Sequence, residues 1–139
     1  MTSAVIKALK KHIDDRKIAI LDAPPGTACP VVTSIEGMNY CVLVTESTPF
    51  GFYDLRLAVD VVRAIKVPFG VIINRYGLGD SRVEEYCKAE GIPVLLKIPN
   101  DRKIAELYSK GIPFVREMPE WNERFLSVFE AIKLQLAGK

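Results

Sequence analysis

The amino-acid sequence predicts a single α/β domain, over 1–139, in which helices flank a parallel sheet to give three layers. Its short apolar runs are continuous rather than alternating, which is typical of parallel strands covered on both faces. Segments with helical periodicity separate these runs, as expected for strand–helix–strand crossovers. The 139 residues are 49% hydrophobic and 26% charged. This length and composition suit one domain with a buried core.

The N-terminal part predicts a helix followed by a buried strand. Over 5–17, apolar residues recur at helical spacing, opposite lysines and aspartates. The apolar run 18–21 then stops at Asp22, shortly before two prolines and Gly26, a sequence that no helix tolerates. We therefore expect a buried strand that ends at a carboxylate.

The rest of the chain repeats this alternation. Further strands are expected at 41–45, 69–74 and 93–98, and helices at 53–66, 81–90, 101–110 and 120–136. Asp80 or Ser81 can cap the second of these helices and Asp101 the third, and a glycine follows each of the two. The last helix carries large aromatic side chains at core spacing, which favours packing against the sheet over membrane binding.

Composition argues against several classes of protein. The formal net charge is +2 and the basic residues are dispersed, so neither a nucleic-acid nor a membrane partner is expected. No apolar stretch approaches the roughly 20 residues that cross a bilayer, and no signal peptide is recognisable, so we expect a cytoplasmic protein. Cys29, Cys41 and Cys87 lack Cys-x-x-Cys spacing. Reduced, mostly buried thiols are expected, without an iron–sulfur cluster.

Chemistry is expected where the strands end, because open parallel sheets bind ligands beyond the carboxyl ends of their strands. A buried carboxylate at Asp22 would be costly unless it met a cation, a metal-bound water or several hydrogen-bond donors. Gly26 would let a backbone N–H approach an anion without a Cβ in the way. The loops that follow the strands lie at 22–27, 46–50, 74–77 and 99–101.

The run over 18–31, with Asp-Ala-Pro-Pro-Gly-Thr at its centre, resembles the Walker B and switch II segment of MinD/ParA-type P-loop ATPases. The resemblance is closest to MinD-superfamily members with an inserted ferredoxin domain, and it extends over 17–133. Further matching segments lie at 44–49, 73–75 and 98–101. The resemblance implies a P-loop NTPase-like fold.

The same resemblance implies roles for individual residues. Asp22 would hold the Mg²⁺ of Mg-ATP through a water, and Gly26 would sense the γ-phosphate, so both would serve catalysis. Asn74 would hydrogen-bond the adenine edge, because its amide has the donor and the acceptor that adenine requires. One wall of the adenine slot would be formed by Pro99, Asn100 and Asp101.

The phosphate loop of that family has no counterpart in the sequence. Neither Gly-x-x-x-x-Gly-Lys-Ser/Thr nor the family's lysine-bearing variant occurs, so the resemblance covers only the C-terminal half of such a domain. We therefore expect the chain alone neither to hydrolyse ATP nor to bind it tightly. ATP and Mg²⁺ are expected as cofactors only when the missing half is supplied.

The resemblance also implies an open place in the sheet, because the phosphate-loop strand of the family lies between the strands matching 18–21 and 41–45. A partner could fill that place, the strands could close together, or two copies could exchange elements. The expected partners are an N-terminal ATPase half or a second copy. Iron–sulfur or metal-centre proteins are expected as clients on the resemblance alone.

Other interpretations stay open. The main alternative is a non-catalytic scaffold for protein–protein contact that derives from the same fold. Gly77 and Gly79 hint at a dinucleotide fingerprint, but Arg82 stands where the third glycine belongs. His12 is expected on a solvated face. Cys29 follows the switch-like loop, and a small buried side chain is favoured there over a reactive thiol.

Overall fold

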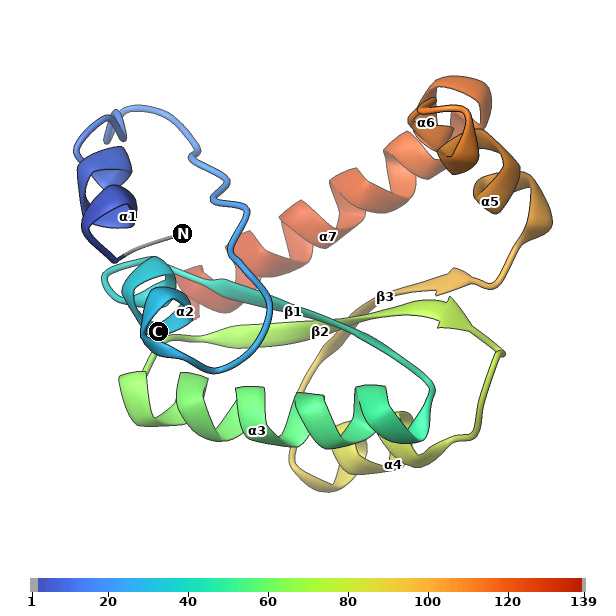
Figure 1. Cartoon of the computed structure of the whole chain (residues 1–139), viewed down its shortest axis with the longest axis horizontal. Helices are drawn as coiled ribbons and strands as arrows, with labels where there is room; N and C mark the ends of the chain where they lie inside the picture. Colours follow the sequence, from blue (N-terminus) through green and yellow to red (C-terminus); the bar gives the residue numbers. More distant parts are fainter. Residues whose placement is uncertain (1–2, 139) are drawn as a thin grey trace.

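The computed structural model describes residues 3–138 of the chain (Figure 1). Residues 1, 2 and 139, which the expected domain bounds include, lie outside the described residues. The elements are, in order, α1 (Ser3–Lys10), α2 (Cys29–Ile35), β1 (Cys41–Glu46), α3 (Pro49–Ile65), β2 (Phe69–Tyr76), α4 (Arg82–Ala89), β3 (Val94–Pro99), α5 (Arg102–Ser109), α6 (Phe114–Glu117) and α7 (Glu120–Ala137).

A parallel sheet in the order β1-β2-β3 forms the centre of the fold. Helices α3 and α4 cover one face and α7 crosses the other, so the predicted three-layer α/β architecture is confirmed (Figure 1). β1 pairs with β2 from Cys41 opposite Phe69 to Glu46 opposite Asn74. The polar residues at the carboxyl ends of the strands therefore share one edge of the sheet.

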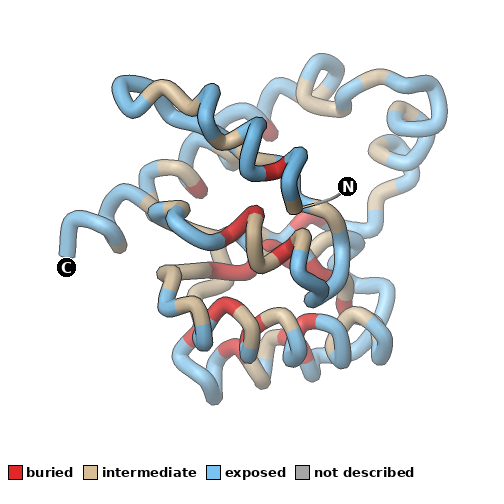
Figure 2. Tube along the Cα trace, turned by 60° about the vertical axis from the view of Figure 1, so that its left-hand side comes forward, coloured by how far each residue is buried: buried red, intermediate tan, exposed pale blue. Residues whose placement is uncertain are grey.

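Residues of β2 belong to a hydrophobic core on each face of the sheet. Val71 and Ile73 are fully buried on the side of α3 and α4, where they pack with Val59 of α3. Ile72, which lies between them in sequence, packs on the opposite side against Trp121 of α7. Because neighbouring residues of a strand face opposite ways, two covered faces require the continuous apolar run seen in the sequence. Figure 2 shows the buried residues gathered where the sheet and helices meet.

Trp121 anchors the long C-terminal helix α7. Its ring makes a T-shaped contact with Phe114 at a centroid distance of 5.4 Å, and the same cluster includes Ile98 and Val128. Aromatic side chains bury large apolar areas, so this cluster is a main source of stability for the second core. The prediction that the last helix packs against the sheet is confirmed. None of the helices within residues 3–138 combines the length and the hydropathy that crossing a membrane requires.

The helix α2 is absent from the sequence-based expectation. Pro30 stands in its first turn, where a missing N–H costs nothing. The Ser34 hydroxyl donates to the Pro30 carbonyl at 2.9 Å, so it is satisfied inside the helix. Val31 and Ile35 pack against Val62 of α3. Tertiary packing on α3 therefore stabilises a short helix whose own residues favour it weakly.

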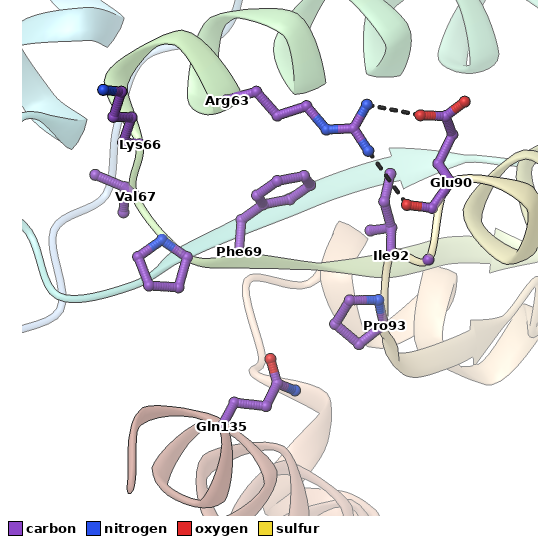
Figure 3. A pocket seen from close by; sticks show the side chains of 10 residues that line it. Arg63, Lys66, Val67, Phe69, Glu90, Ile92, Pro93 and Gln135 are labelled. Atoms are coloured by element: carbon purple, nitrogen blue, oxygen red, sulfur yellow. Dashed lines mark hydrogen bonds and ion pairs between the residues drawn. The ribbon is translucent and has the colours of Figure 1, made fainter. Parts of the chain in front are cut away.

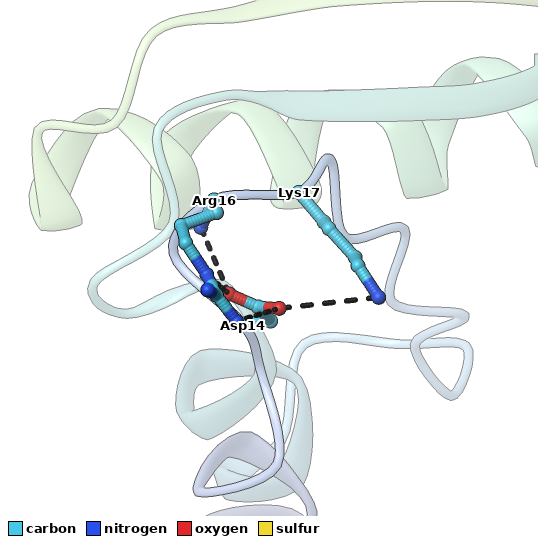
Figure 4. A network of polar contacts seen from close by, with 3 residues as sticks. All are labelled: Asp14, Arg16 and Lys17. Atoms are coloured by element: carbon cyan, nitrogen blue, oxygen red, sulfur yellow. Dashed lines mark hydrogen bonds and ion pairs between the residues drawn. The ribbon is translucent and has the colours of Figure 1, made fainter.

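The first helix is shorter than the one predicted over 5–17. α1 ends at Lys10, whose ammonium group donates to two carbonyls at the end of α2. Beyond it, Asp14 accepts a hydrogen bond from Arg16 Nε at 3.0 Å and lies 3.9 Å from Lys17 Nζ (Figure 4). The hydrogen bonds from Arg16 hold the pKa of Asp14 below its ordinary value. These local contacts form a turn where the periodicity alone predicted helix.

The strand predicted over 18–21 is wrong. These residues form a coil that pairs with no described strand, and Ile18 and Ile20 are 69% and 93% exposed. An apolar run becomes a strand only where a neighbouring strand pairs with its N–H and C=O groups, and the coil at 18–21 does not pair with the open edge of β1. β1 is consequently an edge strand, with its outer side unpaired within residues 3–138 and with Val44 65% exposed.

Candidate functional site

A β-bulge interrupts β2 near its carboxyl end. β2 pairs with β3 at Ile73 opposite Lys97 and again at Tyr76 opposite Pro99, which leaves β2 one residue longer between these pairs. Within this stretch Arg75 has a φ of 50°, in the left-handed region that non-glycine residues seldom adopt. Bulges redirect side chains and are frequent beside functional sites. The bulge therefore marks this edge of the sheet as a candidate site.

Four of the predicted site residues gather at this edge. Asn74 is half-buried within the bulge. The Asn100 N–H donates to the Tyr76 carbonyl at 2.9 Å and so keeps the end of β3 beside the bulge. Asp101 caps α5 by accepting a hydrogen bond from a backbone N–H in the first turn at 2.7 Å, which confirms its predicted capping role. The ends of the adjacent strands β2 and β3 thus carry Asn74, Pro99, Asn100 and Asp101.

One ion pair joins the carboxyl ends of β1 and β2. Arg75 Nη1 lies 3.5 Å from Glu46 Oε1, and the two side chains are 52% and 37% exposed. An exposed pair of this kind contributes little to stability, so the guanidinium group is weakly held. Just beyond β1, Thr48 caps α3 by accepting a hydrogen bond from the Gly51 N–H at 3.0 Å. The cap fixes the loop that follows β1.

A cavity of about 200 Å³ lies between the loops that follow β1 and β2. Ser47 lines it with a residue exposure of 2%, and its hydroxyl has no hydrogen-bond partner within residues 3–138. A buried hydroxyl without a partner is costly. Gly79 packs so closely on this loop that a Cβ would lie 1.4 Å from the Ser47 carbonyl oxygen. Backbone contact therefore joins the two loops.

The other predicted site residues, Asp22 and Gly26, lie in the exposed coil between α1 and α2. Gly26 has a φ of 95°, which glycine adopts at little cost. No hydrogen bond or ion pair among the described residues joins either of them to Asn74 or to the end of β3. The expectation of a buried carboxylate at Asp22 is wrong, because no strand forms before it. The structure does not bring these two residues into the Asn74 group.

Metal-ligating side chains are sparse in the described part of the chain. There, no three or more His, Cys, Asp and Glu side chains come together in a way that could hold a metal ion. His12 is exposed, as predicted. Cys87 is buried and Cys41 is half-buried, but Cys29 is exposed at the start of α2, so the buried thiol expected there is wrong.

The larger cavity, of about 390 Å³, lies at the opposite end of the sheet. Figure 3 shows Arg63 of α3 reaching Glu90 beyond α4, with a distance of 2.6 Å from Nη1 to Oε2. Phe69 and Gln135 also line this cavity, which opens at the amino ends of β2 and β3. None of the predicted site residues lies there.

Sequence reasoning missed two features of the candidate site. Arg75 belongs to a segment that was matched by resemblance, but its left-handed backbone leaves no signal in a residue type other than glycine. Ser47 follows a predicted strand, yet its lack of a partner depends on the position of the loop around Gly79. Both features depend on contacts that form only in the folded structure, so no sequence pattern predicts them.

Known proteins resemble the chain over most of its length, although no protein-family model matches it. An uncharacterized protein of Methanocaldococcus jannaschii is 32% identical over 83% of the chain and 40% of its own length. An iron–sulfur cluster carrier protein of Aquifex aeolicus is 29% identical over 97% of the chain and 43% of its own length. The chain therefore spans less than half the length of these relatives.

A solved structure also resembles the chain. The crystal structure of the cell division ATPase MinD of Pyrococcus furiosus matches with a TM-score of 0.70 and 28% sequence identity. The match covers 96% of this chain and 57% of the MinD chain. Its parallel sheet and flanking helices agree with the architecture described above. The chain is therefore a relative of the MinD-type P-loop ATPases.

Proposed function

We propose that this chain forms the adenine side and the Mg²⁺ side of the nucleotide site of a MinD-like ATP-dependent switch. The observation that carries the proposal is the gathering of Asn74, Pro99 and Asn100 at the carboxyl edge of the sheet. Ligands of open parallel sheets bind at this edge. An amide between two strand ends suits a base that presents both a donor and an acceptor. Asp101 completes the proposed adenine side.

In this proposal, Asp22 and Gly26 form the phosphate side of the nucleotide site. A single exposed carboxylate such as Asp22 fits Mg²⁺ that arrives with ATP, since this ion keeps most of its waters and binds one or two carboxylates. The described residues offer no larger acidic cluster, so the donor set suits Mg-ATP better than a resident metal centre. Bound Mg²⁺ would neutralise phosphate charge. Gly26, with its left-handed φ, would act as the pivot of the switch segment.

The lysine phosphate loop comes, in this proposal, from a segment outside the 139 residues. The printed sequence contains no such motif, and the open outer side of β1 offers a place for an added parallel strand. Exposed Val44 on β1 and exposed Ile20 in the preceding coil would be covered by that strand. Hydrolysis and tight binding of ATP then require the added segment, and the chain alone lacks both activities.

The client of the proposed switch is an iron–sulfur protein or a metal-centre protein. This part rests on the relatives, because the Aquifex aeolicus protein and two Pyrococcus proteins are named iron–sulfur cluster carrier proteins. The chain would contribute nucleotide-dependent contact with the client.

The test is a nuclear magnetic resonance titration of the ¹⁵N-labelled chain with millimolar Mg-ATP. The expected shifts fall on the amide signals of Asn74, Asn100 and Asp101. The Asn74→Ala variant should lose most of this effect, whereas Asn39→Ala, which changes an exposed asparagine elsewhere, should keep it. A chain that shows no shift at these amides is a scaffold without a nucleotide site. Steady-state ATP turnover by the chain alone contradicts the proposed external phosphate loop.

A further inference from the structure

We infer that the cavity at the amino ends of β2 and β3 binds a small organic carboxylate with an apolar body. This site goes beyond the proposed function, because it lies at the opposite end of the sheet from Asn74 and shares no residue with the proposed nucleotide site. Its volume of about 390 Å³ falls within the range of roughly 300–1,000 Å³ that is typical of small-molecule pockets.

The floor of the cavity is apolar. Pro68 and Pro93 stand immediately before β2 and β3, and neither residue has an N–H to donate. Their carbonyl oxygens already accept hydrogen bonds, since the Cys41 N–H donates to Pro68 and the Val71 N–H donates to Pro93, both at 2.9 Å. The half-buried ring of Phe69 adds to this surface. A hydrocarbon or aromatic body would therefore lose its contact with water on entering the cavity without displacing polar contacts.

Arg63 is held in a defined orientation at the rim. Its Nη1 donates to Glu90 Oε2 at 2.6 Å, and its Nη2 donates to the Glu90 carbonyl at 3.2 Å (Figure 3). The other N–H groups of the guanidinium make no hydrogen bond within residues 3–138. A guanidinium group that is already oriented can bind a carboxylate through its planar fork with little further loss of side-chain freedom.

Gln135 supplies a second donor, from the α7 side of the cavity. Its Oε1 accepts the hydrogen bond from the Tyr40 hydroxyl at 2.8 Å, which leaves the NH₂ group of the amide to serve a ligand. Figure 3 shows the Gln135 amide directed from α7 toward the amino ends of the strands. The unused hydrogen-bonding groups on both sides of the cavity are thus donors, which suits a ligand that presents acceptor oxygens.

The charge of the rim favours a monoanion. Arg63 and Lys66 are cationic, and Glu90 is the one carboxylate among the described residues that line the cavity. Glu90 is paired with Arg63, whereas Lys66 makes no ion pair within residues 3–138. Lys66 also has a φ of 62°, at the end of α3, where glycine would be less strained. The lining therefore keeps one unbalanced positive charge, which a single carboxylate would neutralise.

The experiment titrates the ¹⁵N-labelled chain with benzoate and, in parallel, with benzyl alcohol, which has the ring but no charge. Benzoate should shift the side-chain signals of Arg63 Nε–H and of the Gln135 NH₂ group. It should bind roughly tenfold more tightly than the alcohol, as expected for one charge-assisted hydrogen bond at a partly exposed site. The amides of Asn74 and Asn100 should not shift, so failure of this test leaves the proposed function standing.

Two variants test whether benzoate occupies this cavity. Gln135→Glu keeps an oxygen that accepts from Tyr40 but replaces the NH₂ group by a second carboxylate, so benzoate binding should weaken roughly tenfold through like-charge repulsion. Asn122→Asp makes the same amide-to-carboxylate change at an exposed position of α7 outside the cavity and should bind as the unaltered chain does. Lys66→Gly should weaken binding roughly two- to fivefold, as for an exposed ion pair. Its melting temperature should not fall, because glycine suits the left-handed backbone.

Four results overturn the inference. Equal binding of benzoate and benzyl alcohol contradicts recognition of the carboxylate. Inorganic phosphate that shifts the same signals as strongly as benzoate contradicts the need for an apolar body. Unchanged benzoate binding by Gln135→Glu, with its melting temperature intact, places the ligand outside this cavity. Absence of any shift at Arg63 and Gln135 with millimolar benzoate excludes the site altogether.

Discussion

The Tyr40 hydroxyl donates a hydrogen bond to Gln135 Oε1 at 2.8 Å and thereby joins residues that are 95 positions apart. The contact connects the segment before β1 with the last turns of α7. Tyr40→Phe removes the donor and leaves the ring, so the free energy of unfolding should fall by about 1 kcal/mol. Urea denaturation followed by circular dichroism measures this change.

Gln135→Ala should cost a similar amount, and the double variant should cost less than the two single costs added together, because both remove the same bond. Fully additive costs would mean that the bond contributes nothing to stability.

Alkaline pH should destabilise the fold through the Cys87 thiol and the Tyr40 phenol. Burial raises the pKa of Cys87 and of Tyr40 above their ordinary values of 9.0 and 10.0. A group whose pKa is raised by folding contributes its stabilisation fully below the unfolded pKa and loses it as pH rises through the folded pKa. The urea midpoint should therefore fall as the pH rises above 9.0.

Cys87→Ala removes one of these titrating groups. Its midpoint starts lower because a small cavity forms, but it should decline less steeply with pH than that of the unaltered chain. Parallel declines for the two proteins contradict the assignment to Cys87.

Gly79 should resist substitution although it lies in an exposed loop. A Cβ at this position would lie 1.4 Å from the Ser47 carbonyl oxygen, so Gly79→Ala must separate the loops that follow β1 and β2. A loss of roughly 1–3 kcal/mol in the free energy of unfolding is expected from such overpacking. The neighbouring Leu78→Ala, at an exposed side chain, should change stability by less than about 0.5 kcal/mol. Equal effects of the two substitutions would contradict the close approach.

The thiols should differ in their rates of reaction with a thiol reagent. Cys29 is exposed, Cys41 is half-buried and Cys87 is buried, so one fast phase is expected before two slower ones. Burial also raises the pKa of Cys41 and Cys87, which lowers their thiolate fractions at neutral pH. Cys29→Ser should remove the fast phase alone. A fast phase that survives this substitution would assign it to another cysteine.

The open side of β1 should support association of the chain at high concentration, in the absence of any other strand. Val44→Lys places a charge on this edge and should shift the population toward monomer in analytical ultracentrifugation. Leu134→Lys replaces an apolar residue on α7 that is also exposed, and it serves as the matched control. A monomeric mass for the unaltered chain at every concentration contradicts association through this edge.

The strand β2 was predictable because its residues contact helices on both faces of the sheet. Val71, Ile72 and Ile73 read as one apolar run, and their alternate burial against α3 and α7 explains it. The run at Ile18 and Ile20 reads the same way, but no described strand pairs with it. The sequence pattern reports only that the residues are apolar, whereas strand formation also requires hydrogen-bond pairing with a neighbouring strand.

The gathering of Asn74 with Pro99 and Asn100 was predictable, since parallel strands end together. The backbone of Arg75 was not, because the bulge depends on how β2 resumes its pairing with β3 at Tyr76. Helix α2 was missed for a related reason. The helical pattern of α2 is weakened by Pro30, Thr33 and Ser34. The helix therefore depends on packing against Val62 rather than on its own residues.

The strand order β1-β2-β3 follows the chain without interruption. Each strand can therefore join the previous one as soon as the intervening helix has formed, and no strand has to enter between two that are already paired. Topologies dominated by such near neighbours fold quickly, because the chain closes short loops before long ones. A ribosome releasing this chain could complete the β1–α3–β2 unit before β3 emerges.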